Sequence, residues 1–340
     1  MTKMKTKLIL IIACISMFQV TILAQQECRD VLMKANTLYE SGKVDECIST
    51  LEPCVKTLET KEESFEGYKL LAIASHGLGY MDNANYYIRE MLSFQPDYQK
   101  YPNGDPSAFT KEVAKYQVRP KLSLGLKVGS SLNSSRLVQS YSALNELQRY
   151  KNTIGYQFGV CGSYLLPSDL SLRCSILIGG TGVEHEIESE GIWSKNYTEN
   201  IQFFTVNIGV KKDFGINKKV DVFGGLDAGL MLLNSSFVTV TSLVNSPESF
   251  KVDTKNAIDE RNKLQPHLGL VAGLSYELER GKFDVEIGYN LFFTNTVIGS
   301  ERMSDIDFIF DSQYINDDLK LGLYTLNLVY TLPLNYRINK

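Results

Sequence analysis

The stretch FDVEIGYNL, residues 283–291, decides the fold because its large apolar side chains occupy every second position. One set is Phe283, Val285, Ile287, Tyr289 and Leu291, and the intervening set is Asp284, Glu286, Gly288 and Asn290. A β-strand places successive side chains on opposite faces, whereas a helix brings together residues three and four apart. The stretch therefore predicts a strand with one apolar and one polar face.

Seven more segments of the chain after residue 117 show the same alternation. Their apolar sets are Leu122/Leu124/Leu126/Val128, Tyr156/Phe158/Val160/Tyr164, Leu172/Cys174/Ile176/Ile178, Phe204/Val206/Ile208/Val210, Val222/Leu226/Ala228/Leu230/Leu232, Leu268/Leu270/Ala272/Leu274/Tyr276 and Tyr324/Leu326/Leu328/Tyr330/Leu332. Each segment offers the roughly 9–11 residues that a tilted membrane strand needs. The sequence thus predicts eight strands.

The connections between these segments alternate in length. The short ones are residues 167–169, 215–218 and 280–281, and the long ones are residues 131–152, 182–200, 234–263 and 295–318. Outer-membrane β-barrels have short periplasmic turns and long extracellular loops. We therefore predict an eight-stranded antiparallel transmembrane β-barrel over residues 118–340, in the outer membrane, with its long loops extracellular.

Aromatic residues gather at both ends of the predicted strands, as amphipathic rings do at the two membrane interfaces. They are Tyr164, Phe214, Tyr276, Phe283 and Tyr330 at the short-turn end, and Tyr156, Phe203, Phe204, Phe293 and Tyr324 at the long-loop end. A soluble β-sandwich would also alternate, but it would not sort aromatic residues and loop lengths in this way.

The first 24 residues have the pattern of a signal peptide. Lys3, Lys5 and Lys7 precede an apolar run, and Ala24 offers a small residue at the cleavage position. A lipoprotein box at Cys14 is the alternative, but its apolar stretch would be short. No other segment is apolar for the roughly 18 residues that a membrane helix needs.

Residues 25–117 change to helical spacing and form the second predicted domain, which the topology places in the periplasm. Helices are expected near residues 28–40, 43–58, 62–78, 83–94 and 106–115, the last with Asp105 as N-cap and Pro106 at the first helical position. Ala35, Gly42, Cys47 and Leu51 recur as Ala72, Gly79, Ala84 and Ile88. This spacing predicts a small tetratricopeptide-like (TPR-like) unit of about two repeats. The predicted fold class is α+β multidomain, with either a protein-docking or a barrel-capping role for the helices.

The cysteines suggest one disulfide. A helix hairpin that turns near Ser41 would bring Cys28 opposite Cys54, and export exposes thiols to an oxidising compartment. We predict a Cys28–Cys54 bond. For Cys161 and Cys174, which flank the turn at Ser168, we predict no bond because their side chains would point to opposite faces.

Charged residues occupy the inward-facing positions of the barrel. They are Lys127, Arg173, Lys211, Asp221, Asp227, Glu277, Asp284 and Glu286. Eight strands enclose a lumen that side chains fill, and isolated charges there would be costly. We therefore expect a network of ion pairs in the lumen. A narrow pore or transporter is the alternative function.

No spacing of residues predicts catalysis, so we assign no catalytic, cofactor-binding or metal-binding residues and expect no enzyme. The net charge of −4 and the lack of a Lys/Arg cluster exclude nucleic acid as a favoured partner. A lipid-acting enzyme using His185 on the second long loop is the remaining alternative. Glu184, Glu186, Glu188 and Glu190 beside it are expected to be solvated carboxylates, although acidic loops facing lipopolysaccharide favour bridging divalent cations.

Three runs of sequence resemble the PorT-like outer-membrane β-barrel family of Gram-negative bacteria, in its subset with a TPR-like preface. They are the Ala24-Gln25 signal junction, LYESGKVDECISTLEPCV at residues 38–55 and LGLYTLNLVYTL at residues 321–332. The resemblance implies a barrel in the outer membrane and no catalytic residues. The chain departs from many barrels by ending in Tyr336-Arg-Ile-Asn-Lys340 instead of an aromatic residue. The expected function is a structural or interaction component of a secretion or uptake complex, in contact with outer-membrane lipid, lipopolysaccharide and an unidentified periplasmic protein.

Overall fold

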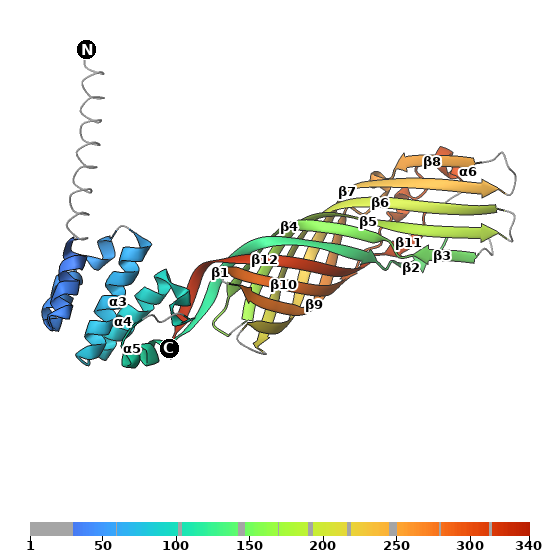
Figure 1. Ribbon diagram of the computed structural model, residues 1–340. Helices are drawn as coiled ribbons and strands as arrows, with labels where there is room; N and C mark the ends of the chain where they lie inside the picture. Colours follow the sequence, from blue (N-terminus) through green and yellow to red (C-terminus); the bar gives the residue numbers. More distant parts are fainter. Residues whose placement is uncertain are drawn as a thin grey trace, which may run out of the picture. The chain divides into compact units, whose positions relative to one another are not determined.

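The computed structural model describes residues 30–58, 60–100, 104–141, 147–168, 170–189, 193–215, 219–244, 250–278, 280–312 and 315–340. The chain divides into two compact units (Figure 1). The helical unit runs to Arg119 and also contains Asn335–Lys340, while the barrel unit comprises Pro120–Leu334. The last six residues thus belong to the helical unit, whereas the sequence analysis assigned them to the barrel. The predicted signal peptide and Cys14 lie outside the described residues.

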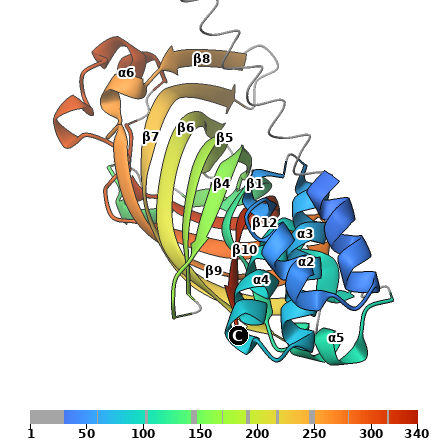
Figure 2. The same cartoon turned by 90° about the vertical axis from the view of Figure 1, so that its left-hand side faces the viewer.

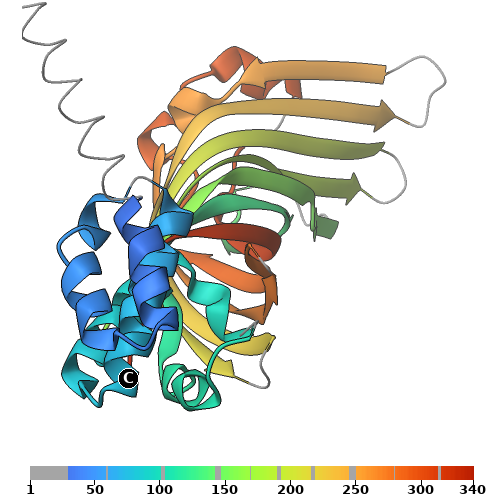
Figure 3. The ribbon, with the colours of Figure 1, turned by 60° about the vertical axis from the view of Figure 1, so that its left-hand side comes forward.

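The helical unit contains neighbouring helices joined by short turns (Figure 3). They are residues 30–40, α2 (Val44–Leu51), α3 (Lys61–Gly77), α4 (Met81–Phe94) and α5 (Ser107–Val113), with 3-10 turns η1 (Val55–Thr57) and η2 (Pro96–Lys100). Helix α3 begins with a capping box, in which the Thr60 hydroxyl accepts from Glu63 N and the Glu63 carboxylate accepts from Thr60 N.

Two helix boundaries differ from the sequence prediction. The helix expected over residues 43–58 ends at Leu51, because Pro53 has no N–H to continue it and its ring would clash with a preceding carbonyl. Cys54 therefore lies beyond α2, at the start of η1. Pro106 is the N-cap of α5 and not its first helical residue, so the predicted N-cap is one residue too early.

The sequence repeat corresponds to two equivalent helix turns. Gly42 and Gly79 both adopt positive φ, at 81° and 80°. Lys43 N donates to Leu38 O, and Tyr80 N donates to Ser75 O at the matching place. Both glycines thus end their helices in the same left-handed conformation. The repeated small and apolar residues Ala35, Cys47, Leu51, Ala72, Ala84 and Ile88 are all fully buried.

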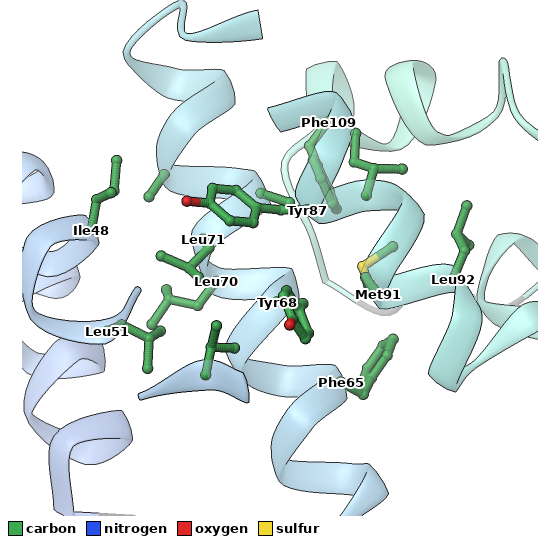
Figure 4. Close-up of a cluster of buried hydrophobic side chains, with 14 of the residues drawn as sticks. Ile48, Leu51, Phe65, Tyr68, Leu70, Leu71, Tyr87, Met91, Leu92 and Phe109 are labelled. Atoms are coloured by element: carbon green, nitrogen blue, oxygen red, sulfur yellow. The ribbon is translucent and has the colours of Figure 1, made fainter. Parts of the chain in front are cut away.

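The core of the helical unit is formed by the helix at residues 30–40 together with α2, α3, α4 and α5 (Figure 4). Leu51, Leu71, Met91 and Phe109 are among its most buried side chains. Tyr87 on α4 connects the second repeat to the first, because its hydroxyl donates a hydrogen bond of 2.7 Å to Oε1 of Glu52, which follows α2. Burial and this hydrogen bond raise the pKa of Tyr87.

Within the described residues, every helix is too short or too polar to cross a membrane. Cys54 is disulfide-bonded, but Cys28 lies outside the described residues, so their pairing stays a prediction. Cys161 and Cys174 are free thiols.

Eight long strands of the barrel unit form a closed antiparallel ring, among the residues that the structure describes. In ring order they are β1 (Gln117–Asn133), β4 (Ile154–Leu165), β5 (Leu170–Ser189), β6 (Trp193–Gly215), β7 (Val220–Val244), β9 (Leu264–Leu278), β10 (Gly281–Phe292) and β12 (Gly322–Asn339). Strand β12 pairs with β1 and closes the ring. The predicted number and antiparallel order of strands are confirmed.

The outer surface of the ring carries the apolar sets predicted from the alternation. Leu126 on β1, Leu270 on β9 and Ile287 on β10 are each more than 60% exposed on the isolated chain. Such a continuous apolar band is unfavourable in water and suits lipid. Phe203 differs from the prediction: it points inward and is buried, so it does not belong to the aromatic residues at the interface.

The long connections are largely β-structure and not irregular loops, which corrects the sequence prediction. Strands β5, β6 and β7 continue past the ring, where β8 (Phe250–Asn256) pairs with β7 (Figure 2). On the other side β3 (Leu147–Lys151) pairs with β5 (Figure 1). We call this sheet, opposite the short turns, the distal extension. A cover packs on its inner face, made of η3 (Ile258–Glu260), η4 (Gly299–Glu301), α6 (Ile306–Ser312) and β11 (Asp318–Lys320), which pairs with β2 (Arg136–Gln139).

The strands can continue past the ring because their apolar side chains move from the outer face to the inner face, where the cover buries them. On β5 the exposed set is Leu172, Cys174, Ile176 and Ile178, whereas beyond Gly180 the buried set is Val183, His185 and Ile187. Below this point the outer face is apolar and exposed, and above it the inner face packs against the cover. Apolar and polar residues therefore still alternate, but the apolar ones now face inward. The sequence prediction looked only for apolar residues on the outer face, so it did not recognise this part of the strands.

Candidate functional site

An ion-pair network fills the lumen near the short turns, and we call it the lumen network. Glu286 on β10 lies at its centre: its carboxylate is 2.6 Å from Lys127 Nζ on β1 and 2.8 Å from an Arg173 guanidinium nitrogen on β5. Arg173 Nε also lies 3.5 Å from Asp227 on β7. Because each residue is on the inward face of its strand, four separate strands meet through these charges.

A second part of the lumen network lies closer to the turns. Lys211 Nζ on β6 is 2.5 Å from Asp284 Oδ2 and 3.6 Å from the centre of the Phe223 ring. Lys282 Nζ lies 2.9 Å from Asp213 and 3.6 Å from Asp221. Lysines and carboxylates alternate here, so no buried charge of this group stands alone, as its desolvation cost requires.

The structure brings together seven of the eight charged residues proposed from the sequence. The exception is Glu277, which is exposed near the turn and in no ion pair with a described residue. Asp213 and Lys282 were missed, although they have the same strand parity as Lys211 and Asp284. Both would have been found by following the inward-facing positions one step closer to the short turns, from Lys211 to Asp213 and from Asp284 to Lys282.

A layer of uncharged polar side chains follows further along the lumen. Gln157 Nε2 donates to Asn327 Oδ1 at 2.5 Å, and Asn207 Nδ2 donates to Ser175 Oγ at 3.2 Å. His267 Nε2 lies 2.9 Å from Asn207 Oδ1. These hydrogen bonds link strands that are adjacent or two apart in the ring.

An apolar layer closes the lumen at the end that leads into the distal extension. It consists of Val183, Ile201, Phe203, Met231, Leu233, Phe292, Leu319, Leu321 and Leu323, none more than 5% exposed. We call it the apolar plug. Small residues make room for its rings, since a Cβ added at Gly179 would lie 2.7 Å from Phe203 Cζ. Buried polar side chains lie beside it, since Gln265 is the strand partner of Met231 and Thr181 precedes Val183 on the same face of β5.

A buried arginine holds the cover on the distal extension. Arg261 is 1% exposed, and its Nε donates to Glu199 Oε1 at 2.7 Å. Its Nη2 donates to the hydroxyl of Tyr197 at 3.0 Å and to Asn316 Oδ1 at 3.1 Å. Burial opposes the charged form, but the Glu199 carboxylate outweighs it and raises the pKa of Arg261. No sequence periodicity marks this residue.

His185, the residue of the enzyme alternative, lies beneath an aromatic ring. It is fully buried on the inner face of β5, and the Tyr150 ring stacks on it with centroids 4.1 Å apart. Glu184 and Glu186 point to the opposite, outer face, where both contact Lys151. The three residues of this run therefore do not converge on one site. Among the described residues, no group of three or more His, Cys, Asp or Glu side chains could hold a metal ion.

A protein-family model described as "Outer membrane protein beta-barrel domain" matches residues 112–297. No curated protein matches the chain.

Several solved structures are similar to the chain in part. Neisserial surface protein A (NspA) is 11% identical, with a TM-score of 0.33, over 64% of this chain and 99% of its own. Ail, the attachment invasion locus protein of Yersinia pestis, is 17% identical, with a TM-score of 0.29, over 62% and 99%. OprG of Pseudomonas aeruginosa is 9% identical, with a TM-score of 0.31, over 63% and 97%.

Proposed function

The chain belongs to the outer membrane protein β-barrel domain family, and on that premise we propose that it is a structural and interaction protein whose closed barrel anchors a helical docking unit in the periplasm. The filled lumen carries this proposal. A conducting barrel needs a continuous polar path, whereas here the apolar plug follows directly on the polar layers. The same observation counts against the pore or transporter alternative.

The orientation follows from the lengths of the connections. Short turns join β4 to β5, β6 to β7 and β9 to β10, and family barrels keep such turns periplasmic. The chain enters β1 from the same end, so the helical unit is expected in the periplasm and the distal extension outside the cell. A periplasmic domain after a cleaved signal peptide also agrees with a disulfide at Cys54.

The helical unit offers an aromatic surface for a periplasmic protein. Tyr80, which precedes α4, and Met81 and Tyr86 within it are 50%, 39% and 43% exposed. Aromatic and methionine side chains are enriched at protein interfaces. The TPR-like repeat supports a docking role in an envelope complex for secretion or uptake, and lipopolysaccharide and lipid would surround the barrel.

Site-specific photocrosslinking in the native envelope tests the docking role. A photoreactive amino acid at Tyr86 should capture one discrete periplasmic protein, and the same group at Glu66, exposed on α3, serves as the matched control. Deleting the helical unit separates docking from capping. If no protein is captured and the barrel without the helices melts earlier in detergent, the helices are a structural cap and the docking proposal is wrong.

A planar bilayer measurement tests the closed barrel. The refolded protein should give no single-channel openings, because the plug is apolar and buried. Discrete openings that persist in the wild-type protein would establish the narrow pore instead. Assays of lipid composition after replacing His185 by Ala address the enzyme alternative, for which we expect no change.

A further inference from the structure

The cover exposes three large apolar side chains on one side of α6 and the turn before it. Met303, Ile306 and Phe310 are 56%, 70% and 82% exposed. Ile306 and Phe310 are four residues apart and share one face of α6, and Met303 lies in the turn that precedes the helix. We call this row the apolar ridge. Phe310 is as exposed as the lipid-facing residues of the ring, yet it lies on a polar connection and not on a membrane strand.

The ridge stands on a firmly held support. On the opposite side of α6, Phe308 packs against the buried cluster of the distal extension, and Lys255 Nζ lies 4.3 Å from the centre of its ring. Ser312 is buried, and its carbonyl accepts a hydrogen bond from Lys195 Nζ at 2.9 Å. The Asp305 carboxylate caps the helix by accepting from Phe308 N at 3.0 Å. The ridge is therefore preorganised and needs little ordering on binding.

The rim of the ridge is acidic. Glu301, Asp307 and Asp311 are exposed around it. Arg302, the basic residue of this segment, is buried, pairs with Asp318 and covers the Tyr141 ring at 3.4 Å. From residue 299 to residue 312 the exposed charge is therefore entirely negative.

We propose that the apolar ridge docks a cationic amphipathic segment of another protein, one that presents an apolar stripe flanked by Lys or Arg. The proposal rests on the orientation proposed above, which places α6 outside the cell. Charge complementarity selects this occupant. Two copies of the chain meeting through the ridge would bring equal acidic rims together, since a two-fold contact pairs a surface with itself. A lipid surface that carries phosphates would likewise repel the rim.

Binding of designed peptides to the purified full-length chain tests the inference. The protein is placed in phosphatidylcholine nanodiscs, and the probe is a labelled helical Leu/Lys peptide, with empty nanodiscs subtracted. A Leu/Glu peptide of the same pattern and a Lys/Ser peptide without apolar residues are the controls. We expect the Leu/Lys peptide to bind and both controls to fail. Raising the salt from about 0.05 M to 0.3 M should weaken binding several-fold, because the Debye length shortens.

The ridge itself is tested by substitution. Ile306→Ser with Phe310→Ser should weaken binding at least about 10-fold, since a few apolar anchors carry most of an interface. Glu301→Gln with Asp307→Asn should weaken it less and reduce its salt dependence. Phe237→Ser is the matched control, because Phe237 is 47% exposed on β7 and lies outside the ridge. The Phe237→Ser variant should bind the Leu/Lys peptide with the affinity of the wild-type protein.

Other outcomes overturn the inference. Equal affinity of the Ile306/Phe310 variant, or equal binding of the Leu/Glu peptide, removes the ridge as the site. If the wild-type protein self-associates and the Ile306/Phe310 variant does not, the ridge binds a second copy of the chain. If the wild-type protein binds phosphatidylglycerol vesicles and the variant does not, the ridge binds a membrane. Orientation is measured separately, by labelling an Asp307→Cys variant in intact cells with an impermeant maleimide. Absent labelling would refute the proposed orientation, while the peptide measurements would still judge the ridge.

Discussion

Lys340 Nζ lies 2.7 Å from Glu112 Oε1, so the last residue of the chain forms an ion pair with α5 of the helical unit. Lys340 Nζ also donates to Asn85 Oδ1 on α4 at 2.8 Å, and Ile338 packs against the helical core. The unusual C-terminal sequence therefore has a structural role: β12 runs on past the barrel residues and its end is part of the helical unit.

Replacing Lys340 by Ala should destabilise the helical unit by about 1 kcal/mol, because Glu112 is buried and loses one of its two charged partners. For a unit of this size, this should lower its melting temperature by roughly 4 °C or more. Helical circular dichroism of the full chain in detergent measures this. Lys111→Ala, on the exposed side of α5, is the control and should melt like the wild-type protein. Equal melting of both variants would deny the C-terminal contact.

Acid should remove the contribution of Glu112. Hydrogen bonds from Lys115, at 2.5 Å, and from Lys340 hold the pKa of Glu112 below its ordinary value. A carboxylate whose pKa is lower in the folded than in the unfolded protein stabilises the folded state at pH values above its unfolded pKa, about 4.3. This stabilisation is lost as the pH falls through the folded-state pKa. The melting difference between the wild-type protein and Glu112→Gln should therefore be constant near neutral pH and shrink below about pH 4. A difference independent of pH would contradict the assignment.

The two turn glycines should respond alike to substitution. At positive φ an Ala is strained, so Gly42→Ala and Gly79→Ala should each destabilise the helical unit by about 1 kcal/mol. Gly77 is the internal control, since it is the last residue of α3 and an added Cβ meets nothing within 4 Å. Gly77→Ala should leave the stability unchanged or raise it. Thermal melts in which all three variants shift the same way would show that the turn conformation is not the cause.

Side-chain alternation predicted the ring well because lipid on one side and a packed lumen on the other impose opposite polarity on neighbouring residues. Leu126 and Lys127 illustrate this, one facing out and one paired with Glu286. The same logic found most of the lumen network. It failed at Glu277, which has the polar parity but lies where β9 leaves the lumen and meets water.

The distal extension was not predicted because its polarity pattern is inverted. Outward Glu184 and Glu186 look like loop residues when an outward apolar set is sought, although Val183 and Ile187 continue the strand on the other face. The cover depends on tertiary contacts that no local pattern encodes. Arg261 follows a short turn in the sequence, and only the fold places Glu199 and Asn316 beside it.

Within the lumen, Glu286→Gln should strongly weaken the barrel, because Lys127 and Arg173 then lose the charge that they share. Removing one partner of a buried ion pair costs about 3–5 kcal/mol. Guanidinium unfolding in detergent should show a lower midpoint, and Glu277→Gln, an exposed carboxylate on the neighbouring strand, should show none of this change. If Glu286→Gln does not refold, the double change Lys127→Met with Glu286→Gln should refold better. A wild-type midpoint for Glu286→Gln would refute the network.

Arg261→Met should loosen the cover while leaving the ring intact, because it leaves Glu199 buried without its cation. A cost of about 3–5 kcal/mol would raise the open population of the distal extension at least about 100-fold. Limited chymotrypsin digestion in detergent should then cut within residues 193–201 or 295–312 and leave the ring strands protected.

Lys263→Met is the matched control, since Lys263 lies two residues away in an exposed pair with Asp259. The double variant Arg261→Met with Glu199→Met removes the stranded charge, so it should regain protease resistance relative to Arg261→Met. Equal digestion of Arg261→Met and Lys263→Met would mean that the cover is held by its apolar contacts and not by this arginine.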